Sequence, residues 1–292
     1  MVAAGKQFKL TIFTGVMAPD WLYQTGMQSM NFVEEAGGMR PPGTYRMPVP
    51  WDPVMLGYYD NLLSEMSAHF GSNANLVGVN LGGPTQYSVE MHLPPEVATQ
   101  PGYSPAAIRG AWDHVLTTYA GLFPNTAGIV ALANPVYVTD GVAAQVAADT
   151  VSILGNRATL QHDALSAKST LAFYNIHQLL VAYAQLGVRI GFEELTVSSN
   201  SRFGGTFDTA WQTVLSAGGK YLDLYQPDDK LAQPFPPSAA VVGRQAFYNN
   251  SAFDGYSPFA TAADDGAIAP DKAALLPGGT ASFSNYTSYS RG

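Results

Sequence analysis

The sequence predicts an α/β fold with parallel strands, and three observations support this prediction. Short runs of β-branched and other apolar residues recur six times between residues 8 and 225, as is typical of strands buried on both faces. A segment with helical periodicity separates each run from the next, which implies right-handed crossovers between parallel strands. Acidic, polar or aromatic residues follow the runs, where an α/β protein presents its chemistry.

The first part of the chain contains one strand, one loop and one helix. Residues 8–14 form the first apolar run, and Gly15 ends it. Residues 26–50 are rich in glycine, methionine and proline and show no clear period, so we expect a long loop there. Asp52 is the expected N-cap of the following helix, with Pro53 at its first position.

A second strand is expected at the start of residues 76–94. Gly82, Gly83 and Pro84 stop the apolar run, and the polar, aromatic and acidic loop that follows contains Glu90. A rigid strand that leads into such a loop can position a catalytic group. The alternative is an ordinary loop in which Glu90 is solvated.

The second half of the chain alternates regularly after a helix that begins at Ser104 and ends near Phe123. The expected elements that follow are a strand at 127–133, a helix at 142–154, a strand at 157–162, a helix at 170–186, a strand at 188–195, a helix at 207–217 and a strand at 221–225.

Six strands in this arrangement favour a TIM-like (β/α)8 barrel over a dinucleotide-binding fold. No Gly-x-Gly-x-x-Gly motif and no phosphate-binding glycine loop follows any of the strands. The barrel is two strands short, so we expect that it lacks the first two βα units and that the chain is a fragment. An open six-stranded sheet is the alternative.

Charge and composition narrow the range of functions. The net charge is −8 and only 14 of the 292 residues are lysine or arginine, which argues against nucleic acid or an anionic membrane as a partner and favours neutral ligands such as sugars. The sequence has no cysteine, and its apolar runs fall short of the ~20 residues that span a bilayer, so we expect no membrane insertion. The five histidines lack metal-site spacing and no Gly-x-Ser-x-Gly motif occurs, so we expect no metal, no cofactor and no serine nucleophile.

Three segments carry a family resemblance: Ala18-Pro19-Asp20-Trp21-Leu22 after the first run, Val49-Pro50-Trp51-Asp52-Pro53 before the first helix, and residues 76–94. Together they resemble the clan A glycoside hydrolases, in particular the family 42 and family 35 β-galactosidase-like barrels and their bacterial relatives. The resemblance implies that the first run is the third barrel strand and that the run at 188–195 is the seventh. In that clan an acid/base glutamate follows the fourth strand and a nucleophilic glutamate ends the seventh.

The resemblance therefore implies Glu90 as the acid/base and Glu193 or Glu194 as the nucleophile. Side chains alternate along a strand, so only one of the last two points inward, and if Ile190 and Phe192 line the barrel it is Glu194. A retaining glycosidase needs one protonated carboxyl and one ionised carboxylate ~5–5.5 Å apart. The alternative is that Glu193 and Glu194 form structural salt bridges.

The fourth strand departs from the family pattern. Clan members usually carry Asn-Glu at its end, whereas here Leu81 follows Asn80 and the first acid is Glu90. Glu90 reaches the site only if the Gly82-Gly83-Pro84 turn folds the loop over the barrel. The side chains expected to contact the sugar are Trp21, Asn80, Gln86, Tyr87, His162 and Asp223. The alternatives are core packing for Trp21 and hydrogen bonding within the protein for His162 and Asp223.

The composition changes after the last strand, so we expect a (β/α) barrel at 1–237 and a separate module at 238–292. The segments Ala267-Ile268-Ala269, Leu275-Leu276-Pro277-Gly278 and the stretch from Asn285 to Gly292 resemble the start of a β-sandwich module of exported proteins in planctomycete-like bacteria. This resemblance implies a secreted or cell-surface protein, although no signal peptide is visible at the start of the chain. The alternative is a plain extension that wraps the barrel.

These observations together predict a glycoside hydrolase that acts on an oligosaccharide or polysaccharide by a two-carboxylate mechanism. The alternative, from another class, is a non-catalytic extracellular protein whose degenerate barrel binds glycan or carries adhesion modules. The separation of Glu90 from Glu193 and Glu194 distinguishes them, because carboxyl groups more than ~10 Å apart lie outside the range of known glycosidases. The sequence leaves the sugar, the linkage and the oligomeric state open.

Overall fold

A computed structural model describes residues 6–35, 40–133, 141–169 and 175–225, together with residues 228, 248, 251–256, 266–273, 280 and 282–285. The chain divides into two compact units, Met1–Asp229 and Lys230–Gly292. In the second unit the described residues include one short 3-10 helix, η7 (Phe283–Asn285), and a turn in which Asp254 Oδ1 accepts a hydrogen bond of 2.8 Å from the Ser251 amide. Most of the expected module at 238–292 lies outside the described residues, and its identity stays a prediction.

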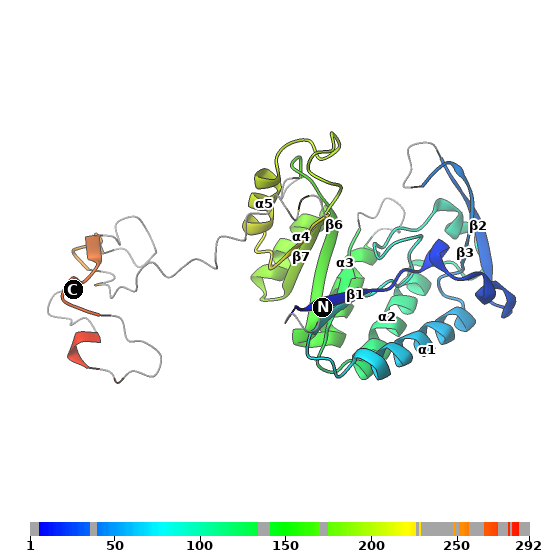
Figure 1. Ribbon diagram of the computed structural model, residues 1–292, viewed down its shortest axis with the longest axis horizontal. Coiled ribbons are helices and arrows are strands. Elements are labelled where there is room, and N and C mark those ends of the chain that lie inside the picture. Colours follow the sequence, from blue (N-terminus) through cyan, green and yellow to red (C-terminus); the bar gives the residue numbers. More distant parts are fainter. Residues whose placement is uncertain are drawn as a thin grey trace. The chain divides into compact units, whose positions relative to one another are not determined.

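The first unit is built on a six-stranded parallel sheet, as the sequence predicts (Figure 1). The strands are β1 (Phe8–Thr11), β4 (Leu76–Asn80), β5 (Ala127–Ala131), β6 (Ala158–Leu165), β7 (Arg189–Glu194) and β8 (Leu222–Asp223). They neighbour one another in that order, so β1 and β8 are the two edge strands. The sheet is a half-barrel, and the α/β prediction of a TIM-like barrel with fewer than eight strands is confirmed.

Five helices connect the strands: α1 (Pro53–Phe70), α2 (Pro105–Leu122), α3 (Val142–Leu154), α4 (Asn175–Gln185) and α5 (Phe207–Ser216). Both N-caps that the sequence predicts, Asp52 and Ser104, are present. The Asp52 carboxylate accepts hydrogen bonds from the first-turn amides of Val54 (3.0 Å) and Met55 (2.9 Å), and the Ser104 hydroxyl accepts one from the Ala107 amide (3.0 Å). Helices α1, α2 and α3 lie side by side (Figure 1).

The prediction of a long loop at 26–50 is wrong. Strands β2 (Ser29–Glu34) and β3 (Gly43–Pro48) form an antiparallel hairpin there. Burial alternates along β2, as in any strand with one covered face, but the buried set ends in Glu34 and the exposed set includes Val33. Because an acid is buried and a valine exposed, the hydrophobicity of the sequence does not alternate although the burial does.

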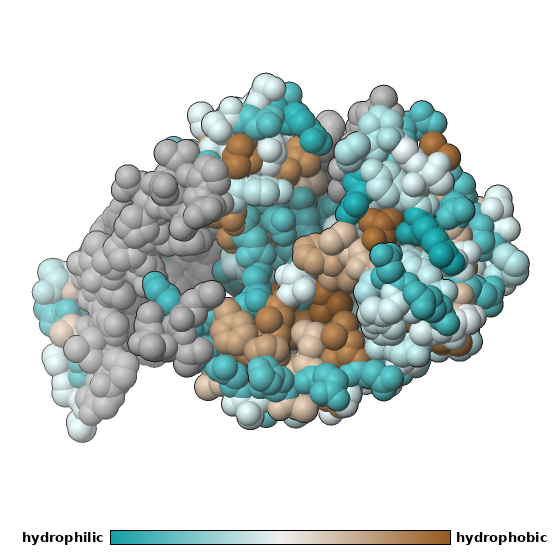
Figure 2. Space-filling model, turned by 45° about the vertical axis from the view of Figure 1, so that its right-hand side comes forward, coloured by the Kyte–Doolittle hydropathy of each residue, from teal (hydrophilic) through white to brown (hydrophobic). Residues whose placement is uncertain are grey.

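The core lies between the sheet and its helices, where Trp112, Tyr119 and Phe123 are almost fully buried. The ring of Tyr119 stacks on Phe123 with centroids 4.8 Å apart. On the face shown in Figure 2, a band of hydrophobic residues is bordered by hydrophilic ones, so both kinds of side chain reach the surface of this unit. In the described part of the chain, no helix has the length and apolar character needed to cross a membrane.

Candidate active site

The register of the sheet decides which side chains share its concave face. Gln161 on β6 pairs with Gly191 on β7, and Glu193 pairs with Asp223 on β8. Paired residues of neighbouring strands point to the same side, and residues two apart on one strand share a face. The register of β6 with β7 shifts between His162 and Leu165, but the Gln161 amide donates to Asp163 Oδ1 (2.7 Å), so Asp163 lies on the same side as Gln161. The carboxyl ends of β6, β7 and β8 thus bring three acids to one side of the sheet.

The helices cover the opposite face. His162, between Gln161 and Asp163, packs against His177 of α4 with ring centroids 4.7 Å apart. Phe192, between Gly191 and Glu193, contacts the same histidine with centroids 5.5 Å apart. His162 and Phe192 therefore face helix α4, and Gln161, Gly191 and Glu193 face the interior of the half-barrel.

Glu90 joins the sheet beside the end of β4. The Leu81 amide still donates to the Ile129 carbonyl (2.9 Å), then the chain leaves the sheet and returns at Glu90, which forms a parallel bridge with Ala131. Because Ala131 pairs with Gln161, the bridge places Glu90 on the same stretch of the sheet as the acids at the ends of β6 and β7. The chain thus folds back as the Gly-Gly-Pro turn requires, and Glu90 occupies the place of a strand-end residue.

Two glycines allow this loop to pack tightly. A Cβ on Gly82 would lie 2.1 Å from the carbonyl oxygen of Ile12, and a Cβ on Gly83 would lie 2.6 Å from the ring of Trp112. The Thr14 hydroxyl donates to the Gly83 carbonyl (2.8 Å) and fixes the start of the loop. Any side chain at either glycine must therefore displace the segment that carries Glu90.

The residues after β1 hold the middle of the same loop. Gly15, in the left-handed region at φ 63°, lies so close to the Gln86 carbonyl that a Cβ would be 1.9 Å from its oxygen. The same carbonyl accepts a hydrogen bond from the Val16 amide (2.8 Å), and the Gln86 amide donates to the His92 carbonyl (2.7 Å). The loop is thereby closed around Glu90, which is 7% exposed.

Burial and neighbouring charges raise the pKa values of two acids on the concave face, Glu193 and Asp163. Burial, the charge of Asp223 and the charge of Glu90 together raise the pKa of Glu193 to about 7, against an opposing effect of Lys9. Burial and the charges of Glu193, Glu90 and Asp223 raise the pKa of Asp163 well above its usual range. Glu90, Asp163, Glu193 and Asp223 thus form one electrostatic unit, which we call the acid cluster.

Polar side chains support the acid cluster from within the half-barrel. The Gln161 amide donates to Asp163 Oδ1 (2.7 Å), and the Tyr221 hydroxyl donates to Gln161 Oε1. The ring of Tyr221 lies against the backbone of Gly191, where a Cβ would meet it at 2.1 Å. Lys9 of β1 forms an ion pair with Asp223 of β8, and its ammonium lies 4.3 Å from the centre of the Tyr221 ring.

The expectation that Glu194 points into the barrel is wrong. Ile190 and Phe192 face the helices instead of lining the interior, so Glu194 follows them and Glu193 is the inward acid. Glu194 is 1% exposed, and its Oε2 accepts a hydrogen bond from the Tyr225 amide (3.2 Å). Burial and the nearby Asp228 raise its pKa to about 7, against the effect of the Tyr225 amide.

His162 does not face the site either, so its expected contact with a sugar is corrected. It is 3% exposed, and its Nδ1 lies 2.9 Å from His177 Nε2. Burial, then the charges of His177 and His92, lower its pKa to about 3, so it is neutral near pH 7. This is the hydrogen-bonded structural role that the sequence left open, and the neighbouring Asp163 is the residue of this strand end that faces the acid cluster.

Trp21 lies in a different place from the acid cluster. Its side chain is 55% exposed and meets the ring of Tyr58 edge-on, with centroids 5.4 Å apart. Both line an apolar cleft of ≈ 350 Å³ between the 3-10 helix η3 (Asp20–Gln24) and α1. None of the four acids lines this cleft, so the structure does not bring Trp21 together with them.

The other residues expected to bind sugar lie closer to Glu90. Asn80 is buried, and its Oδ1 has no hydrogen-bond partner among the described residues. Gln86 is buried and donates from Nε2 to Glu34 Oε2 (3.1 Å). Tyr87 is half-buried, with the guanidinium of Arg40 5.8 Å from its ring centre.

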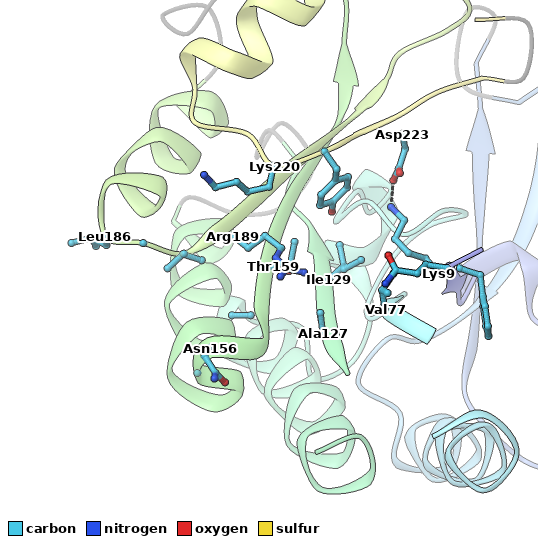
Figure 3. A pocket seen from close by; sticks show the side chains of 17 residues that line it. Lys9, Val77, Ala127, Ile129, Asn156, Thr159, Leu186, Arg189, Lys220 and Asp223 are labelled. Atoms are coloured by element: carbon cyan, nitrogen blue, oxygen red, sulfur yellow. Dashed lines mark hydrogen bonds and ion pairs between the residues drawn. The ribbon is translucent and has the colours of Figure 1, made fainter. Parts of the chain in front are cut away.

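A cavity of ≈ 1010 Å³ opens into the interior of the half-barrel between its edge strands (Figure 3). Figure 3 shows Lys9 and Asp223 joined on one side of it and Lys220, Arg189 and Asn156 on the other. Most of its lining comes from residues at the amino ends of the strands, so it reaches the acid cluster only at Asp223. Barrel enzymes carry their chemistry at the carboxyl ends of the strands, and we therefore place the candidate site at the acid cluster.

Several residues of the site were missed in the sequence. Asp163, Gln161, Lys9 and Tyr221 were not selected, although Gln161 and Asp163 flank His162 at the end of its strand. Among the described residues, no group of three or more histidine, aspartate or glutamate side chains is arranged to hold a metal ion. The carboxyl groups of the acid cluster can transfer protons and attack as nucleophiles, and a lysine and hydrogen-bonding side chains lie beside them.

No protein-family model matches this sequence, and no curated protein matches it. Among solved structures, the catalytic domain of β-amylase from Paenibacillus polymyxa superposes with a TM-score of 0.52 at 12% identity, over 78% of this chain and 78% of that one. The catalytic domain of endoglucanase Cel5A (E5) from Thermobifida fusca gives a TM-score of 0.34 at 13% identity, over 58% of this chain and 50% of that one. The first likeness supports the barrel-type fold, and the second is too weak to carry an argument.

Proposed function

We propose that this protein is a glycoside hydrolase that acts on an oligosaccharide or polysaccharide, with Glu90 and Glu193 as its two catalytic carboxyl groups. One observation carries the proposal: two acids from separate strand ends lie on the same face, close enough that the charge of Glu90 raises the pKa of Glu193. Glycosidases use a pair of carboxyl groups whose surroundings push their pKa values apart. The fold likeness to a β-amylase catalytic domain agrees with this chemistry at a coarse level.

The surroundings of the pair suggest a division of roles. With a pKa of about 7, Glu193 holds a proton near neutral pH and can donate it to the leaving glycosidic oxygen. Glu90 is then the carboxylate that attacks the anomeric carbon or activates water. This assignment exchanges the roles that the family resemblance implies. Asp163, whose pKa is also raised, is a candidate to bind a sugar hydroxyl, with Gln161 fixing its orientation.

Substitution of each acid by its amide tests the proposal. Hydrolysis of a panel of aryl glycosides and oligosaccharides is compared in the wild type, Glu90→Gln and Glu193→Gln, with Glu194→Gln as the matched control on the helix side of the same strand. We expect kcat to fall by roughly 10²–10⁴ in the first two variants, as for loss of a general acid or base, and much less in the control. Unchanged hydrolysis in both Glu90→Gln and Glu193→Gln would refute the assignment of these two residues as the catalytic carboxyl groups.

One observation favours the alternative of a glycan-binding or adhesion protein without catalysis. The Tyr221 ring and the ion pair of Lys9 with Asp223 occupy space inside the half-barrel next to the acid cluster, which leaves less room for a substrate there. Wild-type protein that is retarded by glycans in affinity electrophoresis but hydrolyses none of the panel would support this alternative. The resemblance of residues 238–292 to an exported module implies secretion or attachment to the cell surface, and this location is compatible with both proposals.

A further inference from the structure

A polar cleft of ≈ 490 Å³ lies between the β2–β3 hairpin and the residues that follow β1. Its polar and aromatic lining is Asp20, Tyr23 and Gln24 on one side and Thr44, Tyr45 and Arg46 on the other. None of the acid cluster lines it, so it is a second place where ligand-binding groups converge. A cleft of this size holds one or two sugar units.

Arg46 is held in place by contacts with Tyr23 and Ser29. Its guanidinium lies 4.2 Å from the centre of the Tyr23 ring, and its Nε donates to the Ser29 hydroxyl (2.9 Å). The Tyr23 hydroxyl in turn donates to the backbone carbonyl of Arg46 (3.2 Å). These contacts fix the plane of the guanidinium and leave its Nη groups available for a planar anion.

Among the described residues, Arg46 has no ion-pair partner. Acids outnumber lysines and arginines in this chain, 22 to 14, yet no described aspartate or glutamate forms an ion pair with Arg46. Asp20 lines the same cleft but forms no ion pair with Arg46. A neutral sugar needs no such cation, whereas a carboxylate matches the planar fork of an arginine with two parallel hydrogen bonds.

The cleft is connected to the loop that carries Glu90. The Val16 amide, from the wall of the cleft, donates to the Gln86 carbonyl, and Glu34 of the hairpin accepts a hydrogen bond from the Gln86 side chain. The guanidinium of Arg40 lies 5.6 Å from the ring centre of Tyr45 and 5.8 Å from that of Tyr87. A row of tyrosine and arginine side chains therefore leads from the Glu90 loop to the cleft.

We propose that this cleft binds a uronic acid unit of the glycan, with Arg46 receiving the sugar carboxylate and Asp20, Gln24 and Thr44 binding its hydroxyl groups. The proposal rests on the proposed function only in taking the ligand to be a glycan. It adds that the glycan is acidic and that its charged unit is recognised away from Glu90 and Glu193. The substrate class is then an acidic oligosaccharide or polysaccharide.

Binding is tested by titration calorimetry with the full chain carrying Glu193→Gln, so that hydrolysis does not interfere. The probe is a uronate-containing oligosaccharide, and the matched probe is the same oligosaccharide after reduction of its carboxyl groups to alcohols. We expect the reduced probe to bind about tenfold more weakly or worse, because a charge-assisted hydrogen bond to Arg46 is lost. Equal affinity for the two probes overturns the proposal, and this result is decisive without any further variant.

Variants then locate the contact. Arg46→Gln should weaken binding of the acidic probe about as much as carboxyl reduction does, and should remove the difference between the two probes. Lys220→Gln, which also removes one exposed positive charge but lies at the amino ends of the strands, should leave both affinities unchanged. A loss of affinity that is equal in Arg46→Gln and Lys220→Gln shows general charge attraction and contradicts the assigned site.

This experiment separates the two proposals. If hydrolysis fails for every glycan of the panel while the acidic probe still binds through Arg46, the proposed catalysis is wrong and the assignment of the cleft as a uronate-binding site is correct. If glycans without carboxylates are hydrolysed by Glu90 and Glu193 and the two probes bind equally, the proposed catalysis is correct and the uronate-binding assignment is wrong.

Discussion

Glu193 and Glu194 are neighbours with similarly raised pKa values, but only Glu193 shares its surroundings with Glu90. The two carboxyl groups point to opposite faces of β7, one toward the acid cluster and one toward the backbone of Tyr225. Their pKa values are both raised mainly by burial, yet the charges that act on them differ.

The pH profile of hydrolysis should respond in opposite directions to two changes at the edge strands. Asp223→Asn removes a charge that raises the pKa of Glu193 and frees Lys9, which lowers it, so the alkaline limb of kcat/KM should move to lower pH. Lys9→Met should move that limb to higher pH. We expect each shift to be about half a unit to one unit. Asp208→Asn, an exposed acid on α5, is the control, and shifts of the same sign in both test variants contradict the assignment.

Glu193→Gln should stabilise the protein at alkaline pH. A glutamate with a pKa of about 7 in the folded state and its usual value in the unfolded state binds a proton more tightly when folded. Its contribution to stability is therefore full below about pH 4.5 and is lost as the pH rises through 7. The free energy of unfolding of the variant should exceed that of the wild type by on the order of 1–3 kcal/mol at pH 8, and much less at pH 4.5. Urea unfolding at both pH values measures this, and a gain that does not depend on pH would contradict it.

Acid should destabilise the protein through His162. Burial lowers its pKa to about 3 in the folded state, so the unfolded chain binds the proton first as the pH falls below 6.5. The stability that the neutral side chain contributes is present above pH 6.5 and is lost toward pH 3, by up to about 1.4 kcal/mol per pH unit. The raised pKa values of Glu193 and Glu194 change the stability in the opposite direction over the same pH range. The effect of His162 is therefore isolated by comparing a His162 variant with the wild type. Thermal unfolding of His162→Gln should depend less on pH between 6.5 and 4 than that of the wild type, and identical slopes would rule out this role.

The glycine at the start of the Glu90 loop should not tolerate a methyl group. Gly83→Ala places a Cβ 2.6 Å from the Trp112 ring, which should cost about 1–3 kcal/mol of stability and displace Glu90. Gly57→Ala is the matched control, because this glycine lies inside α1 with nothing within 4 Å of the added atom. The control should gain about 0.5–1 kcal/mol. Denaturant unfolding and hydrolysis assays are carried out on both variants. Equal effects of Gly83→Ala and Gly57→Ala would show that contact with the Trp112 ring does not exclude a side chain at residue 83.

Much of the fold was predictable because local signals and hydrophobic pattern agree. The N-caps Asp52 and Ser104 mark two helix starts, and the six apolar runs became six parallel strands in the expected order. The hairpin at 29–48 was missed because Val33 is exposed and Glu34 is buried, which removes the alternation of hydrophobicity that would predict a strand.

The direction of the side chains at the end of β7 was not predictable from the pattern alone. A strand that is buried on both faces carries apolar residues on both, so Ile190 and Phe192 do not tell which face is the interior. Gly191 was the available signal, since a glycine in a strand often marks close approach of another group, here the Tyr221 ring. The return of the chain to the sheet at Glu90 depends on contacts with Ile12, Thr14 and Trp112, which come from other parts of the sequence.

The ion pair between Lys9 and Asp223 joins residues 214 positions apart, on the first and last strands of the sheet. Contacts of such long sequence separation form slowly, because the intervening chain must be ordered before they can close. During synthesis from the N-terminus, Lys9, Glu90 and Asp163 would emerge well before Asp223, so the nascent chain would hold the cluster incomplete until β8 had left the ribosome. The timing of β8 would then determine when the protein acquires the protonation behaviour of Glu193.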